Sequence, residues 1–250
     1  MSFTGEGPGR PPCKVGAPVT DITAGILAAL GCVSAYTHKL QTGEGQVVDT
    51  SLFEAGIVHT YWQSAIALAT GIAPGPMGSA HPLNGPYQAF EAKDGWFTIG
   101  AANQRNWERL LDAMESPEIA DDPRFATNVD RMAHLKELEE VLTPVFRKRT
   151  RDEWLTRLEK AGVPAGPVMD VCEMFDDPHA QARGMIPTVE HAKLGPVRTL
   201  GLPIKLSETP GEVATGAPLF GQHTEEVLKE YGFGADEIAA FADEGSVAVS

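Results

Sequence analysis

The sequence is poor in cysteine and in positive charge, and each shortage excludes a class of protein. Its three cysteines, Cys13, Cys32 and Cys172, are odd in number and widely spaced, which predicts reduced thiols rather than a disulfide framework or a zinc site. Lysine and arginine total 20 against 34 aspartate and glutamate, giving a formal net charge of −14. Nucleic-acid binding needs a basic surface that releases counterions, so we expect neither a nucleic-acid partner nor a metal site.

A targeting signal is not expected either. Residues 1–6 contain no basic region followed by an apolar stretch, so a signal peptide is not expected. The apolar runs are short and interrupted, which argues against a membrane span. The chain is long enough for one large domain or two small ones. These features predict a cytoplasmic protein with no membrane partner.

The most informative stretch is residues 15–25, VGAPVTDITAG. Pro18 disfavours the α conformation at Ala17, so the chain should arrive extended and start a helix just after Asp21. A carboxylate at or near the N-cap faces unpaired backbone N–H groups and the positive end of the helix dipole, which favour its ionised form. Local chemistry leaves two interpretations of Asp21, a helix cap or a nucleophile.

Further motifs, which occur in the expected order along most of the chain, distinguish between these two interpretations. Together they closely resemble the family III coenzyme A transferases (the CaiB/BaiF group), which include the formyl-CoA and carnitine-CoA transferases. The matching segments are residues 15–25, residues 42–55 (TGEGQVVDTSLFEA), residues 94–99 (DGWFTI), residues 162–168 (GVPAGPV), residues 217–219 (APL) and residues 221–228 (GQHTEEVL).

The resemblance assigns roles to particular residues. In that family the aspartate that matches Asp21 carries the acyl group covalently, so Asp21 is predicted to be the catalytic residue. A glycine-containing loop over the reacting centre corresponds to the region of Gly78, His81 and Asn84, which are candidate substrate-binding residues; turn formation is the alternative for all three. The resemblance implies a coenzyme A thioester and a small carboxylic acid as substrates, with no permanently bound cofactor, and an interlocked homodimer.

The expected fold class is α/β, as the later portion of this transferase fold. We expect residues 1–74 to belong to an incomplete Rossmann-like large domain, residues 75–185 to form a small α+β domain, and residues 186–250 to return to the large domain. Segments 22–38 and 52–70 are apolar almost all round, which predicts two buried helices, with a β-branched strand at 47–50 between them. The lone His59 is expected to be a packed core or interface histidine rather than a base.

The α+β domain is expected from alternating and helical patterns. Lys93-Asp94-Gly95 between β-prone segments 87–90 and 96–101 predicts a hairpin. Helices are expected at residues 104–114, 128–149 and 151–161, with Thr150 as an N-cap and Gly162 as a terminator. The remainder should contain β-like segments within 185–207 and short helices at 222–231 and 236–243.

Only twenty residues precede Asp21, whereas family members carry a long N-terminal part that binds coenzyme A. We therefore expect a truncated or mis-started chain, or one completed by a separate N-terminal polypeptide, and whether it is active alone is left open. Without that part, the apolar helices should be exposed, which predicts aggregation or a required partner.

Two alternative functions remain. The same family contains α-methylacyl-CoA racemases, which use acid and base residues instead of a covalent adduct. An acidic residue expected after the strand at residue 96 is replaced here by Ala102-Asn103-Gln104-Arg105, which favours a transferase. The other alternative is a non-catalytic or truncated assembly subunit.

Overall fold

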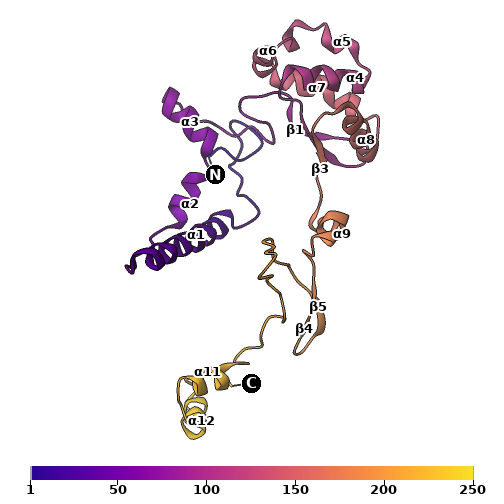
Figure 1. The fold of residues 1–250 in the computed structure, drawn as a ribbon. Helices are drawn as coiled ribbons and strands as arrows, with labels where there is room; N and C mark the ends of the chain where they lie inside the picture. Colours follow the sequence, from indigo (N-terminus) through magenta and orange to yellow (C-terminus); the bar gives the residue numbers. More distant parts are fainter. Residues whose placement is uncertain (1, 250) are drawn as a thin grey trace. The chain divides into compact units, whose positions relative to one another are not determined.

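A computed structural model describes residues 2–249. The chain forms two compact units, Met1–Val168 and Met169–Ser250 (Figure 1). The first unit holds three N-terminal helices followed by an α+β part, and the second holds short helices and a two-stranded sheet. The predicted division at residues 74 and 185 stays a prediction.

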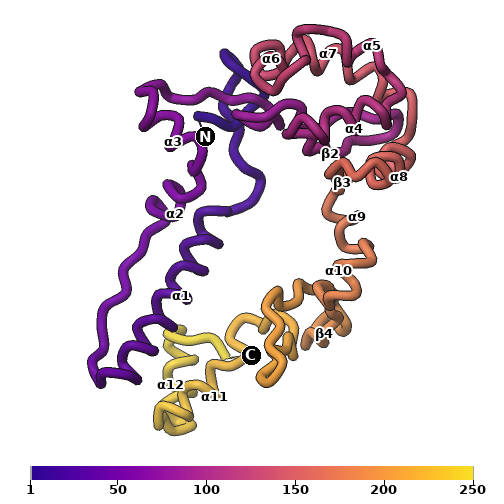
Figure 2. Tube along the Cα trace, turned by 45° about the horizontal axis from the view of Figure 1, so that its top comes forward, coloured from indigo at the N-terminus to yellow at the C-terminus, as the bar shows by residue number. Residues whose placement is uncertain are grey.

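The first unit begins with a long helix and two shorter ones. Their bounds are α1 Val19–Thr42, α2 Leu52–Val58 and α3 Tyr61–Thr70. The segment between α1 and α2 returns alongside α1 (Figure 2), and a Cβ added to Gly31 would lie 2.6 Å from the Val48 Cγ1 atom. A glycine at this point of α1 therefore permits a close approach that any side chain would obstruct.

The sequence-based expectations for this region were wrong in two respects. The segment around Val48 belongs to no strand among the described residues. The expected helix 52–70 is interrupted at Thr60, whose hydroxyl donates to the Ile57 carbonyl at 2.7 Å; such a side chain offers the backbone an alternative to the helical ladder. Across all three helices only Ala55 is buried, which is the exposure expected for apolar helices without the N-terminal part.

An apolar seam lies on the exposed side of α1. Its side chains recur at alternating spacings of four and three residues, the heptad pattern by which one helix packs against another. Tyr36 is 61% exposed and Leu40 is 69% exposed, so residues 2–249 leave the seam largely uncovered. Its members are Ile22, Ile26, Ala29, Val33, Tyr36 and Leu40.

The length of α1 corrects the expectation that no apolar run could span a bilayer. Among the described residues it is the one helix long and apolar enough to do so, with a mean hydropathy of 1.5 over its best window. Length and composition do not by themselves place a helix in a membrane, because core helices of globular proteins meet the same criteria.

The α+β part of the first unit contains its hydrophobic core. An antiparallel three-stranded sheet has the order β1-β2-β3, with Tyr87 opposite Gly100 and Phe97 opposite Pro167. Helices α4, α7 and α8 gather around the sheet (Figure 1). The elements are β1 Tyr87–Glu91, β2 Trp96–Gly100, α4 Gln104–Met114, α5 Pro117–Ala120, a 3₁₀ turn Pro123–Phe125, α6 Asn128–Ala133, α7 Leu135–Phe146, α8 Arg151–Ala161 and β3 Ala165–Pro167.

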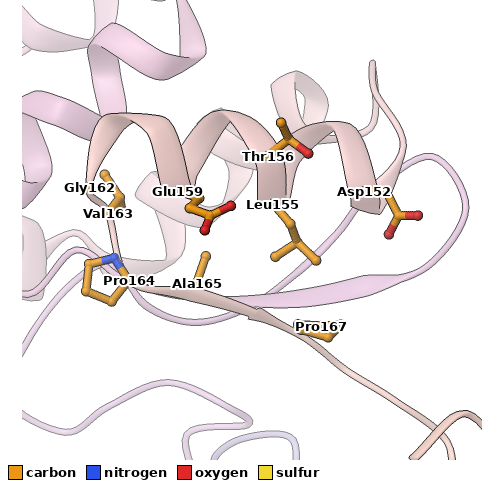
Figure 3. Close-up of a pocket in the computed structure, with 9 residues that line it drawn as sticks. All are labelled: Asp152, Leu155, Thr156, Glu159, Gly162, Val163, Pro164, Ala165 and Pro167. Carbon is orange, nitrogen blue, oxygen red and sulfur yellow. The ribbon is translucent and has the colours of Figure 1, made fainter. Parts of the chain in front are cut away.

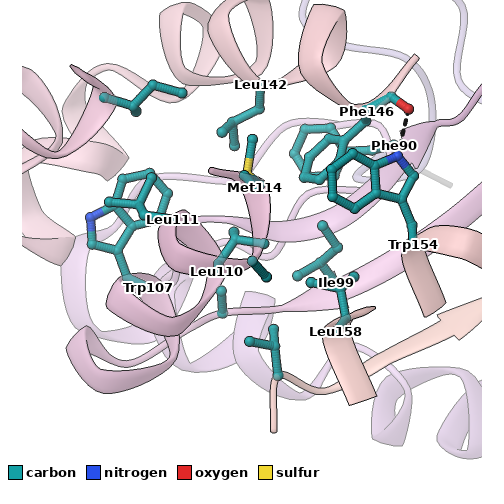
Figure 4. Packing of buried hydrophobic residues seen from close by; sticks show 14 of the residues in the cluster. Phe90, Ile99, Trp107, Leu110, Leu111, Met114, Leu142, Phe146, Trp154 and Leu158 are labelled. Carbon is teal, nitrogen blue, oxygen red and sulfur yellow. Dashed lines mark hydrogen bonds between the residues drawn. The ribbon is translucent and has the colours of Figure 1, made fainter. Parts of the chain in front are cut away.

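Aromatic side chains organise this core (Figure 4). Phe146 contacts Phe90, Phe97 and Trp154 with ring centroids 4.9–5.3 Å apart. The Trp154 Nε1–H group donates to the Phe146 carbonyl at 2.6 Å, so the indole is buried with its polar atom satisfied. The core therefore joins β1, β2, α7 and α8.

Local signals explain why α4 and α8 form where they were predicted. Asn103 caps α4 by accepting from the Asn106 N–H at 2.8 Å. Thr150 and Glu153 form a capping box at the start of α8, and Gly162 ends that helix at φ +68°. Caps satisfy backbone groups that a helix end leaves unpaired. The predicted hairpin and both helices are confirmed, whereas the predicted helix 128–149 is divided at His134 into α6 and α7.

The second unit is less regular. Strands β4 and β5 pair antiparallel, with Val189 opposite Val197. The predicted β-like segment and the two final helices are thus present, while α9 and α10 were not predicted. The elements are α9 Val171–Asp176, α10 Pro178–Ala182, β4 Thr188–His191, β5 Gly195–Arg198, α11 Thr224–Glu230 and α12 Ala235–Asp243.

Candidate functional site

Asp21 lies in the first turn of α1, where the backbone N–H groups of a helix have no intrahelical partner. The helix begins at Val19, two residues earlier than Asp21, and Pro18 is the N-cap residue. Asp21 is therefore near the N-cap, as expected, but the helix starts before it rather than just after it. The Asp21 Oδ2 atom accepts from the Thr20 hydroxyl at 3.1 Å.

Asp21 lines a cavity of about 560 Å³. The walls come from the segment before α1, from the first turn of α1, and from the joint between α2 and α3. Most lining side chains are small or apolar, including Phe3, Val15 and Val19, and the charged ones are Lys14 and Asp21. A cavity of this size and composition fits a small organic ligand.

The N-terminal segment is fastened so that its ends lie beside the cavity. The Cys13 N–H group donates to the Thr4 carbonyl at 3.0 Å, and the Thr4 hydroxyl donates back to the Cys13 carbonyl. The glycine- and proline-rich loop between them is thereby closed. Thr4 and Lys14, at the two ends of this loop, both line the cavity.

His59 was expected to be packed in a core or interface, but it is exposed and lines the Asp21 cavity. Its Nε2 atom lies 2.7 Å from the Thr23 hydroxyl oxygen. This contact ties the α2/α3 joint to the first turns of α1. His59 therefore forms part of the cavity wall, and its ring hydrogen-bonds to Thr23 rather than to Asp21.

Gly78 lies beside the cavity but does not line it. It has φ +63°, and its N–H group donates to the Gly5 carbonyl at 2.8 Å. Because Thr4 lines the cavity and Gly5 is the next residue, the loop that contains Gly78 reaches the segment that forms the cavity wall.

His81 and Asn84 contact their own loop and the neighbouring aromatic residues. The His81 ring stacks on Tyr87 with centroids 5.1 Å apart and meets Trp62 edge-on at 4.8 Å. Its Nδ1 atom accepts from the Leu83 N–H at 3.1 Å and lies 3.4 Å from the Asn84 amide nitrogen. Neither residue lines the Asp21 cavity as the described residues form it.

Helix α6 holds this loop in place. The Asn128 side chain accepts from the Gly85 N–H at 3.1 Å and donates to the Leu83 carbonyl at 3.0 Å. Arg131 is fully buried and donates to the Gly85 carbonyl at 2.6 Å, and burial lowers the pKa of its guanidinium group. The chain that leads into β1 is therefore fixed by side chains that sequence reasoning did not single out.

Other cavities lie elsewhere, and two of them concern residues discussed above. One of about 810 Å³ lies between α8 and β3, where Leu155 and Glu159 point toward the strand (Figure 3). The other, about 520 Å³ in the second unit, is lined by His191, Gln222 and His223. Gln222 and His223 belong to the GQHTEEVL motif, so this motif and Asp21 line different cavities.

The carboxyl groups whose pKa is lowered by neighbours lie in the α+β part. A hydrogen bond from Arg157 is the main cause that lowers the pKa of Glu115, and one from Arg124 lowers that of Asp122. All three cysteine thiols are free and exposed. Within residues 2–249, no three metal-binding side chains are grouped so as to hold an ion.

Comparison with known families identifies the chain. The sequence profile of CoA-transferase family III matches residues 1–224. The chain belongs to this family. The family III profile covers α1 with Asp21, the α+β part and most of the second unit, so the resemblance inferred from the motifs is confirmed.

Similar proteins extend this result. The chain is 34% identical to a succinate–glutarate CoA-transferase of Agrobacterium fabrum over 92% of its length and 57% of that protein. It is 35% identical to a succinyl-CoA:mesaconate CoA-transferase of Haloarcula hispanica, covering 94% of this chain and 58% of that one. It therefore spans little more than half the length of these curated relatives.

A solved structure is also similar. A CAIB/BAIF family protein from Brucella suis superimposes with a TM-score of 0.78 at 34% identity, over 92% of this chain and 59% of that one. The mixed helix and sheet fold of a family III CoA-transferase is thereby confirmed. The roles of Asp21, Gly78, His81 and Asn84 stay predictions.

Proposed function

We propose that this family III chain carries the nucleophile of a CoA-transferase, with Asp21 as the residue that becomes acylated. The substrates are a coenzyme A thioester and a small carboxylic acid, and no permanently bound cofactor takes part. The supporting observation is the position of Asp21, in the first turn of a long helix and in the wall of a cavity with mostly uncharged lining.

The chemistry balances without a separate base. The Asp21 carboxylate attacks the thioester carbonyl of the donor, which forms a mixed anhydride and releases coenzyme A thiolate. The thiolate attacks the Asp21 carbonyl, which forms an aspartyl-CoA thioester and releases the donor carboxylate. The acceptor carboxylate repeats these two steps in reverse, and Asp21 is regenerated. Covalent catalysis of this kind divides one transfer into easier steps.

Groups around Asp21 support this role. Backbone N–H groups in the first turn of α1 are suited to stabilising the oxyanion of each tetrahedral step. The hydrogen bond from Thr20 orients the carboxylate. The donor acid, acceptor acid and thiolate are all anions, so the reaction needs no proton acceptor such as His59.

An anhydride survives only where water is excluded, and Asp21 is exposed in this chain. We propose that a partner covers the site, either a second copy in a homodimer or a polypeptide that supplies the part of the relatives that this chain does not span. The exposed seam of α1 is where such a partner would pack. A cytoplasmic location is part of the same proposal.

The test is direct trapping of the intermediate. Incubation of the chain with succinyl-CoA followed by hydroxylamine should leave a hydroxamate on Asp21, detected by mass spectrometry of the peptide. Asp21→Asn and Asp21→Ala should abolish the hydroxamate and lower the transfer rate by about 10³-fold or more. A matched control is Asp112→Asn, because Asp112 is exposed on α4 and lines none of these cavities. Transfer that survives in both Asp21 variants would refute the assignment.

The racemase alternative predicts a different product. Such an enzyme would exchange the α-proton of a 2-methylacyl-CoA with deuterium from solvent, without any adduct on Asp21. The segment after β2 offers no carboxylate for this purpose: Asn103 caps α4, and the Gln104 side chain accepts from Arg131 at 3.1 Å. These contacts favour the transferase.

A further inference from the structure

The cavity at Asp21 contains one cationic side chain that the proposed chemistry does not use. Lys14 lines the cavity together with Asp21, and the other lining residues apart from His59 carry no ionisable side chain. Among residues 2–249, Lys14 makes no ion pair with a carboxylate. Lys14 is therefore an exposed cation at this cavity with no carboxylate partner.

A free cation at this place is noteworthy because the rest of the chain repels anions. The formal net charge is −14, and the proposed nucleophile is itself a carboxylate, so an anionic substrate approaches against like charge. Lys14 precedes Asp21 by only seven residues and directly follows Cys13, which two hydrogen bonds join to Thr4, one from the Cys13 N–H group and one from the Thr4 hydroxyl. Lys14 and Asp21 thus line the same cavity, and both are exposed in this chain.

The cavity also provides space and apolar contacts for the carbon atoms of a ligand. Its volume of about 560 Å³ accommodates a four- or five-carbon acid, and Phe3, Val15 and Val19 offer apolar contact to methylene groups. A monocarboxylic acid would interact only with Asp21, whereas a dicarboxylic acid would interact with both Asp21 and Lys14.

We propose that Lys14 binds the distal carboxylate of a dicarboxylic acid whose other carboxylate reacts at Asp21. This inference rests on the proposed function and assigns its substrate class. Lys14 is a specificity-determining residue: it selects acids with a second carboxylate and takes no part in the bond-making steps. A lysine suits this role, because its ammonium group is a compact point charge at the end of a flexible stem.

The test compares two acceptors that differ at one end, succinate and butyrate, in Lys14→Met and Lys14→Arg variants. Lys14→Met should raise the KM for succinate by about 10-fold to 100-fold, as expected for loss of a charge-assisted hydrogen bond, with little change in kcat. The KM for butyrate should stay unchanged, and Lys14→Arg should restore part of the succinate affinity. Lys148→Met is the control, since Lys148 is exposed on the same unit and lines no cavity described above.

Direct binding distinguishes failure of this inference from failure of the proposed function. Carbon-13 succinate, observed by NMR, should bind the wild-type chain and the Asp21→Asn variant, and binding should weaken in Lys14→Met. Lys14-dependent binding without any Asp21 adduct would refute the transferase and leave the anion site standing. An Asp21 adduct with succinate binding that ignores Lys14 would overturn the inference alone. A KM increase for every acyl-CoA and for butyrate alike would also overturn it, because Lys14 would then contact the phosphates of coenzyme A.

Discussion

The contact between α6 and the loop before β1 yields a prediction whose size follows from the structure. Asn128 makes two hydrogen bonds to this loop, one from its amide oxygen to the Gly85 N–H and one from its amide nitrogen to the Leu83 carbonyl. Gly85 is buried, whereas Leu83 is 48% exposed. Asn128→Ala removes both bonds, but water can replace only the one at Leu83.

The two bonds differ in what their loss costs. An unpaired buried N–H group costs roughly 1–3 kcal/mol, and an ordinary hydrogen bond contributes about 1 kcal/mol net. Asn128→Ala should therefore lower the free energy of unfolding by roughly 2–4 kcal/mol. For a unit of this size the melting temperature should fall by roughly 4–16 °C.

A matched variant separates the two bonds. Asn128→Asp keeps the acceptor for the Gly85 N–H and loses only the donor to Leu83, and a carboxylate is favourable at the start of α6. It should cost about 1 kcal/mol or less. Urea unfolding followed by tryptophan fluorescence measures both variants, because Trp107 and Trp154 are buried in this unit. Equal losses for alanine and aspartate would refute the argument that the buried Gly85 N–H dominates.

Two other predictions concern association and pH. The α1 seam should drive self-association of the isolated chain, so the double variant Ile26→Gln/Val33→Gln should have a lower mass by light scattering. The control Lys39→Gln, on the same helix, should leave the mass unchanged. An unchanged mass in the double variant would contradict this prediction. Arg157 lowers the pKa of Glu115, and Arg124 lowers the pKa of Asp122. These two ion pairs therefore stabilise the folded chain above the unfolded pKa values of about 4, and the stabilisation is lost as the pH falls through the lower folded pKa values. The urea concentration at the unfolding midpoint should therefore decrease at pH values below about 4. Glu115→Gln should make this decrease slightly smaller, and the effect is slight because these ion pairs are exposed. An identical pH profile in Glu115→Gln would contradict the assignment.

Elements with complete local signals were predictable from sequence. Helix α8 has a capping box at Thr150, an apolar face with Trp154 and Leu158, and Gly162 at its end, and its predicted bounds match the structure. The hairpin around Asp94-Gly95 is equally local. In both cases the residues that define the element are neighbours in sequence, so no knowledge of distant contacts is needed.

Composition shows that the N-terminal helices are apolar, but whether they are buried depends on what packs against them. The composition of α1 describes a helix that requires apolar neighbours, but α2 and the returning segment cover only one side of it. The break at Thr60 was missed for a related reason. The apolar composition of this segment gives no sign of the turn, which is stabilised by a hydrogen bond from the Thr60 hydroxyl to the Ile57 carbonyl.

The candidate site was only partly accessible from sequence. Asp21 was found by its motif, although the helix was expected to start just after it and instead starts at Val19. His59 lies 38 residues further along and reaches the cavity through the α2/α3 joint, which no spacing pattern predicts. Lys14 offered a signal that could have been used, because it is a basic residue close in sequence to the nucleophile in a chain with few cations.

The exposed seam of α1 and the exposed Asp21 carboxylate both require the removal of water. Apolar side chains on α1 gain free energy by leaving water, and an acyl anhydride on Asp21 requires water to leave. Asp21 lies next to Ile22, the first residue of the seam, so a partner that packs along α1 from its first turn also approaches the mouth of the cavity. Burial of the seam and protection of the intermediate would therefore be coupled, and a substitution that weakens association should also shorten the lifetime of the Asp21 adduct.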